Sequence, residues 1–239
     1  KDICKRVFVT HAPDHDVDFT MVLGCNENNL DIDNHFVIAT SICDATAIAP
    51  LLELLDKKIG IKCGQVTTLH PWLNYQNLMD GASSSWSVPG EIYHHYALGR
   101  SVIGNLIPKP TSAITATAQV LSRLTEDDIG SFSYRTPTAI VGSADLTLQL
   151  NKDSSTEEVH KIINEYRSTQ TWEIFDLMNE PLVSLDFVKN RHSAVVDSRW
   201  TDVTGGNLLK LVLWYDNEAG YSLRVLDQIR YVENCFKDS

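Results

Sequence analysis

The chain has 239 residues and a formal net charge of −11, and 43% of its residues are hydrophobic and 21% charged. This length is enough for one large domain with a sizeable core, and the composition excludes a disordered, collagen-like or disulfide-dense chain. The acidic balance argues against a nucleic-acid partner and against a membrane surface, because both need clustered Lys and Arg. No membrane-spanning run and no signal peptide are visible, so we expect a cytoplasmic protein.

The predicted elements follow from hydrophobic periodicity. The expected strands, in chain order, are residues 6–10, 20–24, 35–40, 64–70, 139–150, 182–187, 193–197 and 208–214. The expected helices are residues 45–55, 112–124, 155–167 and 218–232, and Ser155 or Thr156 is expected to cap the third. The long stretch 71–110 is predicted to be irregular, and a loop of that length inside a compact domain is usually functional.

Strands outnumber helices in this pattern, and many follow one another directly. The expected fold class is therefore α+β, as one domain over residues 1–239 with a mixed or antiparallel sheet and helices on one face. Neither G-x-G-x-x-G nor G-x-x-x-x-G-K-[ST] occurs, so no self-contained dinucleotide or P-loop site is predicted.

Five cysteines are widely spaced, and no C-x-x-C is present. The odd number and the spacing predict reduced thiols, with neither a disulfide framework nor a metal site. Cys43 differs from the rest because it lies between an apolar strand and a predicted helix, where unpaired N–H groups stabilise a thiolate or an oxyanion. His70 ends the next predicted strand, so the two are a candidate nucleophile and base. The alternative is a buried cysteine and a hydrogen-bonded histidine without chemistry.

Several short sequence blocks follow one another along nearly the whole chain. They are A-P at 49–50, T-T-L-H at 67–70, I-P at 107–108 followed by Thr111, R-T-P-T at 135–138, D-L-T at 145–147, and W-Y-D-N-E at 214–218 followed by G-Y-S at 220–222. With these blocks the chain resembles the catalytic domain of the glyceraldehyde-3-phosphate dehydrogenase family over nearly its whole length.

The resemblance implies roles for individual residues. Cys43 corresponds to the nucleophile that forms a thiohemiacetal with an aldehyde, and His70 to the base that activates it. Asn217 corresponds to the residue that hydrogen-bonds the nicotinamide carboxamide. The residues that correspond to phosphate-binding positions are Arg135, Thr111 and Ser112. A guanidinium suits bidentate binding of phosphate, although an interface ion pair is the alternative for Arg135.

The chain departs from the family pattern beside the nucleophile and in the phosphate sites. Asp44 stands where the family has a hydroxyl, and Leu73 and Tyr75 stand where it has phosphate-binding threonines. A full negative charge outweighs the helix terminus, which carries roughly half a positive charge, so Asp44 is expected to raise the thiol pKa and to repel phosphate. Two interpretations of Asp44 stay open, a helix-capping acid and a group directed at the substrate.

In the family a nucleotide-binding domain precedes these residues. Residues 1–11 correspond to the end of that N-terminal Rossmann domain, which is otherwise expected to be absent, and the helix over 218–233 would pack on it. Binding of NAD or NADP is expected to need that domain, so this chain alone is expected to be inactive. By resemblance, the partners are a small-molecule aldehyde substrate, phosphate and further copies of the chain in a homo-oligomer.

Two hypotheses for function follow. The first is the catalytic domain of an NAD(P)-dependent phosphorylating aldehyde dehydrogenase, for glyceraldehyde 3-phosphate or for a related substrate such as erythrose 4-phosphate. The second is a non-catalytic relative used for binding or assembly, in which Cys43 and His70 are remnants.

Overall fold

The structure is a computed structural model that describes residues 4–11, 16–74, 76–81, 84–88, 91–94 and 96–238. Tyr75 therefore lies outside the described residues. The helices of the described residues are α1 (Cys43–Lys58), α2 (Ala113–Ala118), α3 (Thr156–Thr169) and α4 (Ala219–Asp238). The strands of the main sheet are β4 (Ile61–Pro71), β7 (Ile107–Lys109), β8 (Ile129–Thr136), β9 (Gly142–Leu150), β10 (Phe175–Met178), β11 (Ala194–Asp197), β12 (Asp202–Thr204) and β13 (Leu208–Tyr215).

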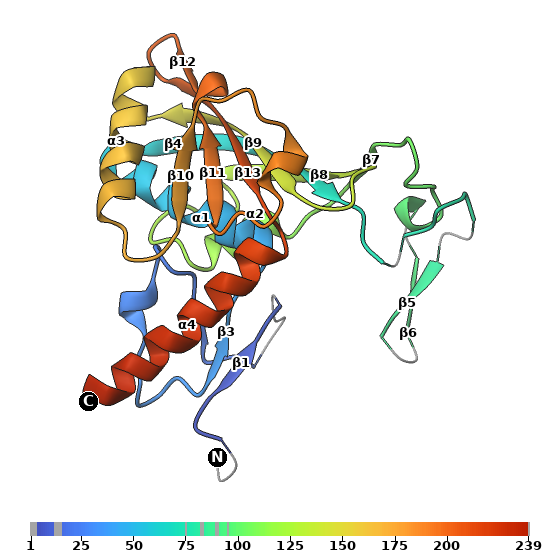
Figure 1. Cartoon of the computed structure of the whole chain (residues 1–239), viewed down its shortest axis with the longest axis horizontal. Helices are drawn as coiled ribbons and strands as arrows, with labels where there is room; N and C mark the ends of the chain where they lie inside the picture. Colours follow the sequence, from blue (N-terminus) through green and yellow to red (C-terminus); the bar gives the residue numbers. More distant parts are fainter. Residues whose placement is uncertain are drawn as a thin grey trace.

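The main sheet is mixed. Its strand order is β10-β11-β13-β9-β4-β8-β7 (Figure 1). β12 pairs with the first residues of β13, whereas β11 pairs near the end of β13. β10 with β11 and β4 with β8 are parallel, whereas β11 with β13, β13 with β9, β9 with β4 and β8 with β7 are antiparallel. The predicted α+β class with a mixed sheet is confirmed.

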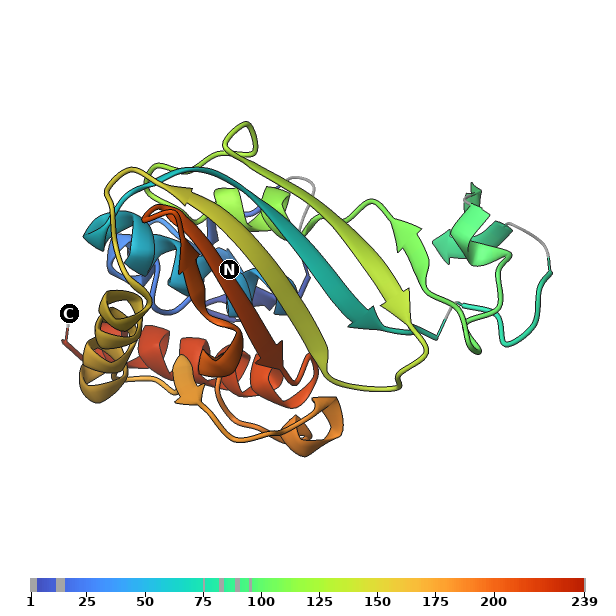
Figure 2. The same ribbon diagram turned by 90° about the horizontal axis from the view of Figure 1, so that it is seen from above.

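One face of this sheet carries the core. Alternate residues of the central strands point to that face, because side chains along a strand alternate between its two sides. The buried residues that they contribute are Val66, Ala144, Leu146, Leu148, Leu209, Leu211 and Leu213. They pack against buried residues of α1 and α3, and Figure 2 shows the helices behind the sheet. The predicted helices on one face are confirmed.

A second, small sheet lies beside α4. It is parallel, with the order β1-β3-β2, and consists of β1 (Val7–Val9), β2 (Phe19–Thr20) and β3 (Val37–Ala39). Ile38 of β3 and Met21, which follows β2, are buried and cluster with Val232 of α4, and Phe236 packs against them. Figure 1 shows α4 running from the main sheet across β3 and β1. After β3, the last strand of this small sheet in the chain, the next element is α1.

The segment between β4 and β8 extends away from the body of the molecule (Figures 1 and 2). It contains a hairpin of β5 (Ser84–Val88) and β6 (Glu91–His94), the short helix η2 (Tyr96–Leu98), and β7. Ala97, Val102 and Ile107 form a small core of their own, against which Trp72 packs. This segment covers most of the stretch 71–110, which was predicted to be irregular, and that prediction is wrong for β5, β6 and β7.

Several elements differ between the prediction and the structure. The predicted strand 182–187 is instead the 3-10 helix η3 (Ser184–Phe187), and α2 covers only the first half of the helix predicted over 112–124. β8 and β10 were not predicted as strands, because polar residues interrupt the apolar pattern of both. Ser155 caps α3 as predicted, and its side chain accepts a hydrogen bond from the backbone N–H of Glu158.

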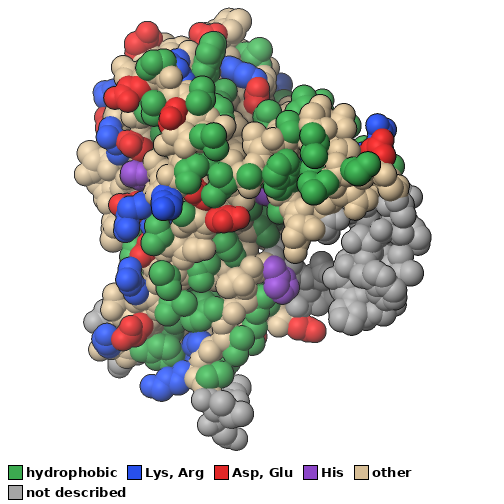
Figure 3. All heavy atoms as spheres, turned by 45° about the vertical axis from the view of Figure 1, so that its right-hand side comes forward, with side chains coloured by type: hydrophobic (Ala, Val, Ile, Leu, Met, Phe, Trp, Pro, Cys, Tyr) green, Lys and Arg blue, Asp and Glu red, His purple; other side chains and the backbone are tan. Residues whose placement is uncertain are grey.

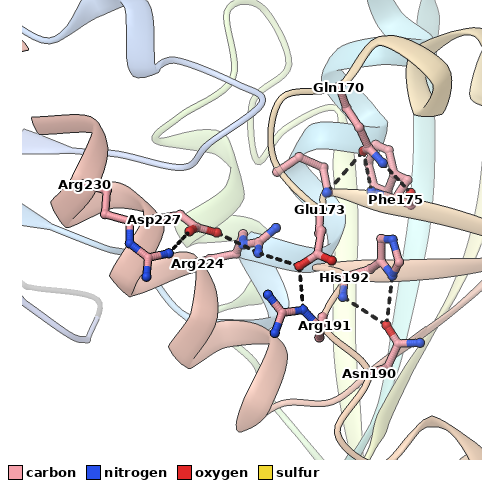
Figure 4. Close-up of polar contacts among 10 residues, drawn as sticks. Gln170, Glu173, Phe175, Asn190, Arg191, His192, Arg224, Asp227 and Arg230 are labelled. Carbon is pink, nitrogen blue, oxygen red and sulfur yellow. Dashed lines mark hydrogen bonds and ion pairs between the residues drawn. The ribbon is translucent and has the colours of Figure 1, made fainter. Parts of the chain in front are cut away.

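The first half of α4 is anchored by buried charge. The Arg224 side chain is 2% exposed, and its Nη2 lies 2.7 Å from a carboxylate oxygen of Asp227, one helical turn further on. Asp227 also accepts a hydrogen bond from Arg230, and Glu173 pairs with Arg191 at 2.9 Å and lies 3.8 Å from Arg224 (Figure 4). This network ties α4 to the loop before β10 and to the loop before β11.

No helix of the described part has both the length and the apolar character needed to cross a membrane.

Candidate active site

Cys43 is the first residue of α1, and the backbone before it is constrained. The chain leaves β3 at Ala39, and Ser41 adopts a left-handed conformation with a φ of 60°. The hydroxyl of Tyr221, on α4, donates to the carbonyl oxygen of Ser41 at 3.0 Å and lies 2.8 Å from Oγ1 of Thr40. A left-handed non-glycine residue costs energy and persists only where its surroundings fix it. The constraint therefore fixes where α1 starts and where the Cys43 side chain lies.

His70 reaches the thiol from the end of β4. Val66, Thr68 and His70 alternate along that strand onto the face covered by the helices, and His70 is close to the N-terminus of α1. The distance from Cys43 Sγ to His70 Nε2 is 3.7 Å, so the predicted meeting of these two side chains is confirmed. His70 Nδ1 lies 2.8 Å from the carbonyl oxygen of Pro71, which can only accept a hydrogen bond. Nδ1 therefore carries the proton, and Nε2 presents a lone pair to the thiol.

The surroundings of Cys43 favour the neutral thiol. Burial raises the pKa of Cys43 most, and the negative charge of Asp44 raises it further. The backbone N–H groups of Cys43 and Asp44 at the helix start and the charge of Arg135 lower this pKa, but they do not offset the first two effects. The sequence predicted the contribution of Asp44, whereas burial proves to be the larger cause.

The imidazole of His70 is also kept neutral. Burial lowers the pKa of His70 most, Asp44 raises it, and Arg135 lowers it again. Lys109 on β7 lowers the pKa of His70 by a smaller amount. Cys43 and His70 therefore form a neutral thiol facing a neutral base, and a protonated imidazole is not available at neutral pH to stabilise a thiolate.

Asp44 is not the cap of α1, because Ile42 occupies the N-cap position and Asp44 is the second residue inside the helix. It is 6% exposed, and its Oδ1 accepts a hydrogen bond of 2.6 Å from the hydroxyl of Tyr215 at the end of β13. Cys43 Sγ lies 3.9 Å from the same oxygen. Gly142 of β9 makes room for this arrangement, because a Cβ there would lie 2.8 Å from the Tyr215 ring. The carboxylate is therefore held facing the thiol.

The predicted phosphate-binding residues lie on two neighbouring elements. Arg135 is on β8 directly opposite His70 in the sheet register, so both side chains point to the same face. Thr111 and Ser112 precede α2, which packs against α1 and β8. The hydroxyl of Thr111 accepts a hydrogen bond of 3.1 Å from the N–H of Ala113, and Ser112 is exposed. Arg135 thus shares the face of Cys43 and His70.

Asn217, the predicted nicotinamide contact, follows β13 and is half-buried. Its Oδ1 accepts a hydrogen bond of 3.1 Å from the N–H of Val141, which itself has a φ of 69°. Because the amide oxygen is occupied, the NH₂ group is the part of this side chain left to face a carboxamide oxygen. Asn217 thus suits one end of a nicotinamide cofactor.

A broad cavity of about 600 Å³ opens beside Glu218, the residue that follows Asn217. Its lining includes Trp72, Leu73, Gln76, Leu78 and Glu218. Leu73, which replaces a predicted phosphate-binding hydroxyl, thus gives this cavity an apolar wall. The N–H of Leu73 donates to Oε1 of Gln76 at 3.0 Å.

Two residues of the site, Tyr215 and Lys109, were not predicted from the sequence. Tyr215 lies inside the W-Y-D-N-E block, and only its position after an alternating apolar strand signals that it points toward the core. Lys109 is one residue beyond the I-P block, and the sequence alone gives no sign that β7 places it on the face of His70. Cys43, Asp44 and His70 also form a group of possible metal ligands, which spacing could not reveal because they come from two separate elements.

The family model "Glyceraldehyde 3-phosphate dehydrogenase, C-terminal domain" matches residues 42–217. The chain is 35% identical over 228 residues to glyceraldehyde-3-phosphate dehydrogenase 1 of Bacillus subtilis, which covers 95% of this chain and 64% of the relative. It is 34% identical over 224 residues to glyceraldehyde-3-phosphate dehydrogenase of Zymomonas mobilis, covering 93% of this chain and 63% of the relative. The chain thus spans a little under two thirds of the length of these relatives.

Proposed function

The chain belongs to the glyceraldehyde 3-phosphate dehydrogenase family, of which it contains the C-terminal domain, and from this premise we propose that it is the catalytic domain of an aldehyde dehydrogenase that acts through Cys43. The observation that carries the proposal is the 3.7 Å approach of Cys43 Sγ to the unprotonated Nε2 of His70. A thiol and a neutral imidazole in this arrangement are a nucleophile and its general base.

The steps assigned to these residues balance with His70 as the base. Sγ attacks the aldehyde carbon while Nε2 of His70 takes the thiol proton and passes it to the carbonyl oxygen, and the product is a thiohemiacetal on Cys43. A nicotinamide cofactor, NAD or NADP, would supply the hydride acceptor, and Asn217 would face its carboxamide. As the hydride leaves with its electron pair, Nε2 of His70 takes the hydroxyl proton, so Cys43 then holds a thioester. Phosphate attacks that thioester, an acyl phosphate leaves, and the proton on His70 returns to Sγ.

Arg135 supports a phosphorylated substrate or inorganic phosphate. It is 8% exposed, and it faces the same side of the sheet as His70, where a guanidinium could bind phosphate in a bidentate manner. Leu73 supports a substrate other than glyceraldehyde 3-phosphate, because an apolar side chain stands where the family binds phosphate.

We also propose that the chain self-associates in the cytoplasm. The extension between β4 and β8 exposes large apolar side chains, and Figure 3 shows hydrophobic side chains spread over the right-hand part of the molecule. The most exposed apolar side chains of this extension are Leu78, Met79, Ile103 and Leu106, each at least 59% exposed. Exposed apolar patches of this kind are typical of protein interfaces.

All five cysteines are free, which suits a reducing compartment such as the cytoplasm.

The second candidate, a non-catalytic relative, is favoured by one observation. Burial and Asp44 raise the pKa of the Cys43 thiol, which is the opposite of what an activated nucleophile needs. The two candidates differ in whether His70 accelerates chemistry at Cys43.

The experiment that separates them uses the half-reaction that needs no cofactor. The chain is incubated with acetyl phosphate, and acylation is mapped by mass spectrometry. In this step the acetyl group moves to Cys43 Sγ, phosphate leaves, and the thiol proton passes to His70. We expect one acetyl group on Cys43, and we expect His70→Asn to slow its formation by about a hundredfold or more.

The matched control is Cys63→Ser, which removes an exposed thiol outside the site and should leave the rate unchanged. Acylation spread evenly over the five cysteines, or a rate that does not respond to His70→Asn, would favour the non-catalytic candidate.

A further inference from the structure

Three different ligand atoms converge at the start of α1. They are Sγ of Cys43, Nε2 of His70 and a carboxylate oxygen of Asp44, and all lie within 4.8 Å of one another. Sγ is 3.7 Å from Nε2 and 3.9 Å from Oδ1. In a tetrahedral zinc site, bonds of about 2.0–2.3 Å place neighbouring ligand atoms about 3.3–3.6 Å apart. The longest separation in the group therefore needs to shorten by at most about 1.5 Å for the three atoms to close around such an ion.

Two of the ligands are already oriented by outer hydrogen bonds. His70 donates from Nδ1 to the carbonyl oxygen of Pro71 at 2.8 Å, which directs the Nε2 lone pair toward Sγ. Asp44 accepts a hydrogen bond of 2.6 Å from Tyr215. Metal-binding histidines and carboxylates in proteins are characteristically held by such partners, which fix the tautomer and the direction of each ligand.

The chemistry of the ligand set selects the ion. A thiolate and an imidazole bind borderline-soft divalent cations such as Zn²⁺, whereas Mg²⁺ and Ca²⁺ prefer sites made of oxygen alone. The Cys43 thiol releases its proton to solvent as the ion binds, and the resulting thiolate and the Asp44 carboxylate then balance the two charges of the ion. Three protein ligands leave the fourth position open to water.

Two cations oppose binding. Arg135 acts on both Cys43 and His70, and Lys109 acts on His70. Their positive charge weakens the attraction for a divalent ion, so a reversible site of moderate affinity is expected rather than a permanent structural one.

We propose that Cys43, Asp44 and His70 form a binding site for Zn²⁺ or a similar thiophilic divalent cation, with Tyr215 as a positioning residue on Asp44. Asp44 is the residue that makes this site, because it stands where the resemblance expects a hydroxyl. A bound ion occupies Sγ and Nε2 together, so it removes the nucleophile and the base at once. Binding of the ion does not depend on whether the chain is a dehydrogenase.

The test titrates the chain with Zn²⁺ alone in competition with a chromophoric chelator, and repeats the titration with Co²⁺ to observe the near-ultraviolet band of a cobalt–thiolate bond. We expect one ion per chain in the wild type. Asp44→Asn should weaken binding by about a hundredfold and Tyr215→Phe by about tenfold, since even outer partners of metal ligands contribute about 10–100-fold. Cys63→Ser, which removes an exposed thiol elsewhere, should bind as the wild type does.

A second measurement uses only the wild-type chain, so its result does not depend on whether a variant folds. Zn²⁺ should protect Cys43 from iodoacetamide in the wild type, as mapped by mass spectrometry, and a chelator should reverse the protection. The proposal is overturned if Zn²⁺ leaves the alkylation of Cys43 unchanged, if a folded Asp44→Asn variant binds as tightly as the wild type, or if Cys63→Ser abolishes binding. Acylation by acetyl phosphate in metal-free buffer tests the proposed function separately.

Discussion

The hydroxyl of Tyr215 donates a 2.6 Å hydrogen bond to Oδ1 of Asp44, so the last residue of β13 holds the second residue of α1. Both groups are buried, and the contact joins residues that are 171 positions apart in the chain. The pKa of Tyr215 is raised, first by burial and then by the charge of Asp44, so the hydroxyl keeps its proton and remains a donor. The position of the carboxylate beside the thiol therefore depends on a strand from the opposite end of the sequence.

Tyr215→Phe should destabilise the chain by about 1.5–3 kcal/mol, because it removes a buried hydrogen bond to a charged acceptor. Urea denaturation measures the free energy of unfolding. The matched variant is Tyr231→Phe, which removes a 3.0 Å hydrogen bond to the backbone carbonyl of Glu27 and should cost about 1 kcal/mol. Equal losses in the two variants would contradict a charged, buried acceptor at Asp44.

Asp227→Asn should destabilise the chain by about 3 kcal/mol or more. The variant leaves the guanidinium of Arg224, which is 2% exposed, without its close ionic partner, and breaking a buried pair on one side is costly. Arg230→Ala is the control, since Arg230 contacts the same carboxylate but its side chain is 67% exposed, and it should cost less than about 1 kcal/mol. Thermal unfolding of both variants ranks them, and a control as damaging as Asp227→Asn would contradict the prediction.

The sequence predicted the fold class and the main contact of the site for a physical reason. The apolar alternation of 139–150 and 208–214 survives in β9 and β13 because both strands are buried on one face only. Cys43 and His70 could be paired because each lies at the end of an element, where elements of a layered domain meet.

The rest depended on contacts between distant residues. β8 carries Ser, Gly and Arg, and it is a strand because it pairs in parallel with β4 and antiparallel with β7. The role of Tyr215 required the register of β13 against β9, and the role of Gly142 appears only once the Tyr215 ring lies across it. Asp44 was expected to act on the thiol by charge, but burial could not be weighed from the sequence.

Stability should fall as the pH falls below about 6.5, and His70 should account for part of the loss. Burial lowers the pKa of His70 in the folded chain, so between the folded and unfolded pKa values the unfolded chain binds more protons. Its contribution to stability is therefore complete above the unfolded pKa and is lost as the pH falls toward the folded pKa. The measurement is the free energy of unfolding in urea from pH 7.5 to 5, in steps of about 0.5 units.

His70→Gln should reduce the slope of that curve, as should His192→Gln, because burial also lowers the pKa of His192. The two variants combined should reduce it further than either alone. A slope that His70→Gln leaves unchanged would show that the imidazole of His70 titrates alike in the folded and unfolded chains.

The last prediction concerns two half-buried thiols that lie near acids. Burial raises the pKa of both Cys43 and Cys25. Asp44 raises the pKa of Cys43 further, and Glu53, followed by Glu27, raises the pKa of Cys25 further. Asp44→Asn should therefore lower the pKa of Cys43 and speed its alkylation by iodoacetamide by about tenfold, and it should leave Cys25 unchanged. Glu53→Gln should do the reverse, although it also removes a 2.8 Å ion pair with Lys57. Mass spectrometry of both peptides over time in metal-free buffer at pH 8 gives the four rates. An Asp44→Asn variant that accelerates both thiols alike would show a loosened fold, and one that accelerates neither would show that the carboxylate does not act on the Cys43 thiol.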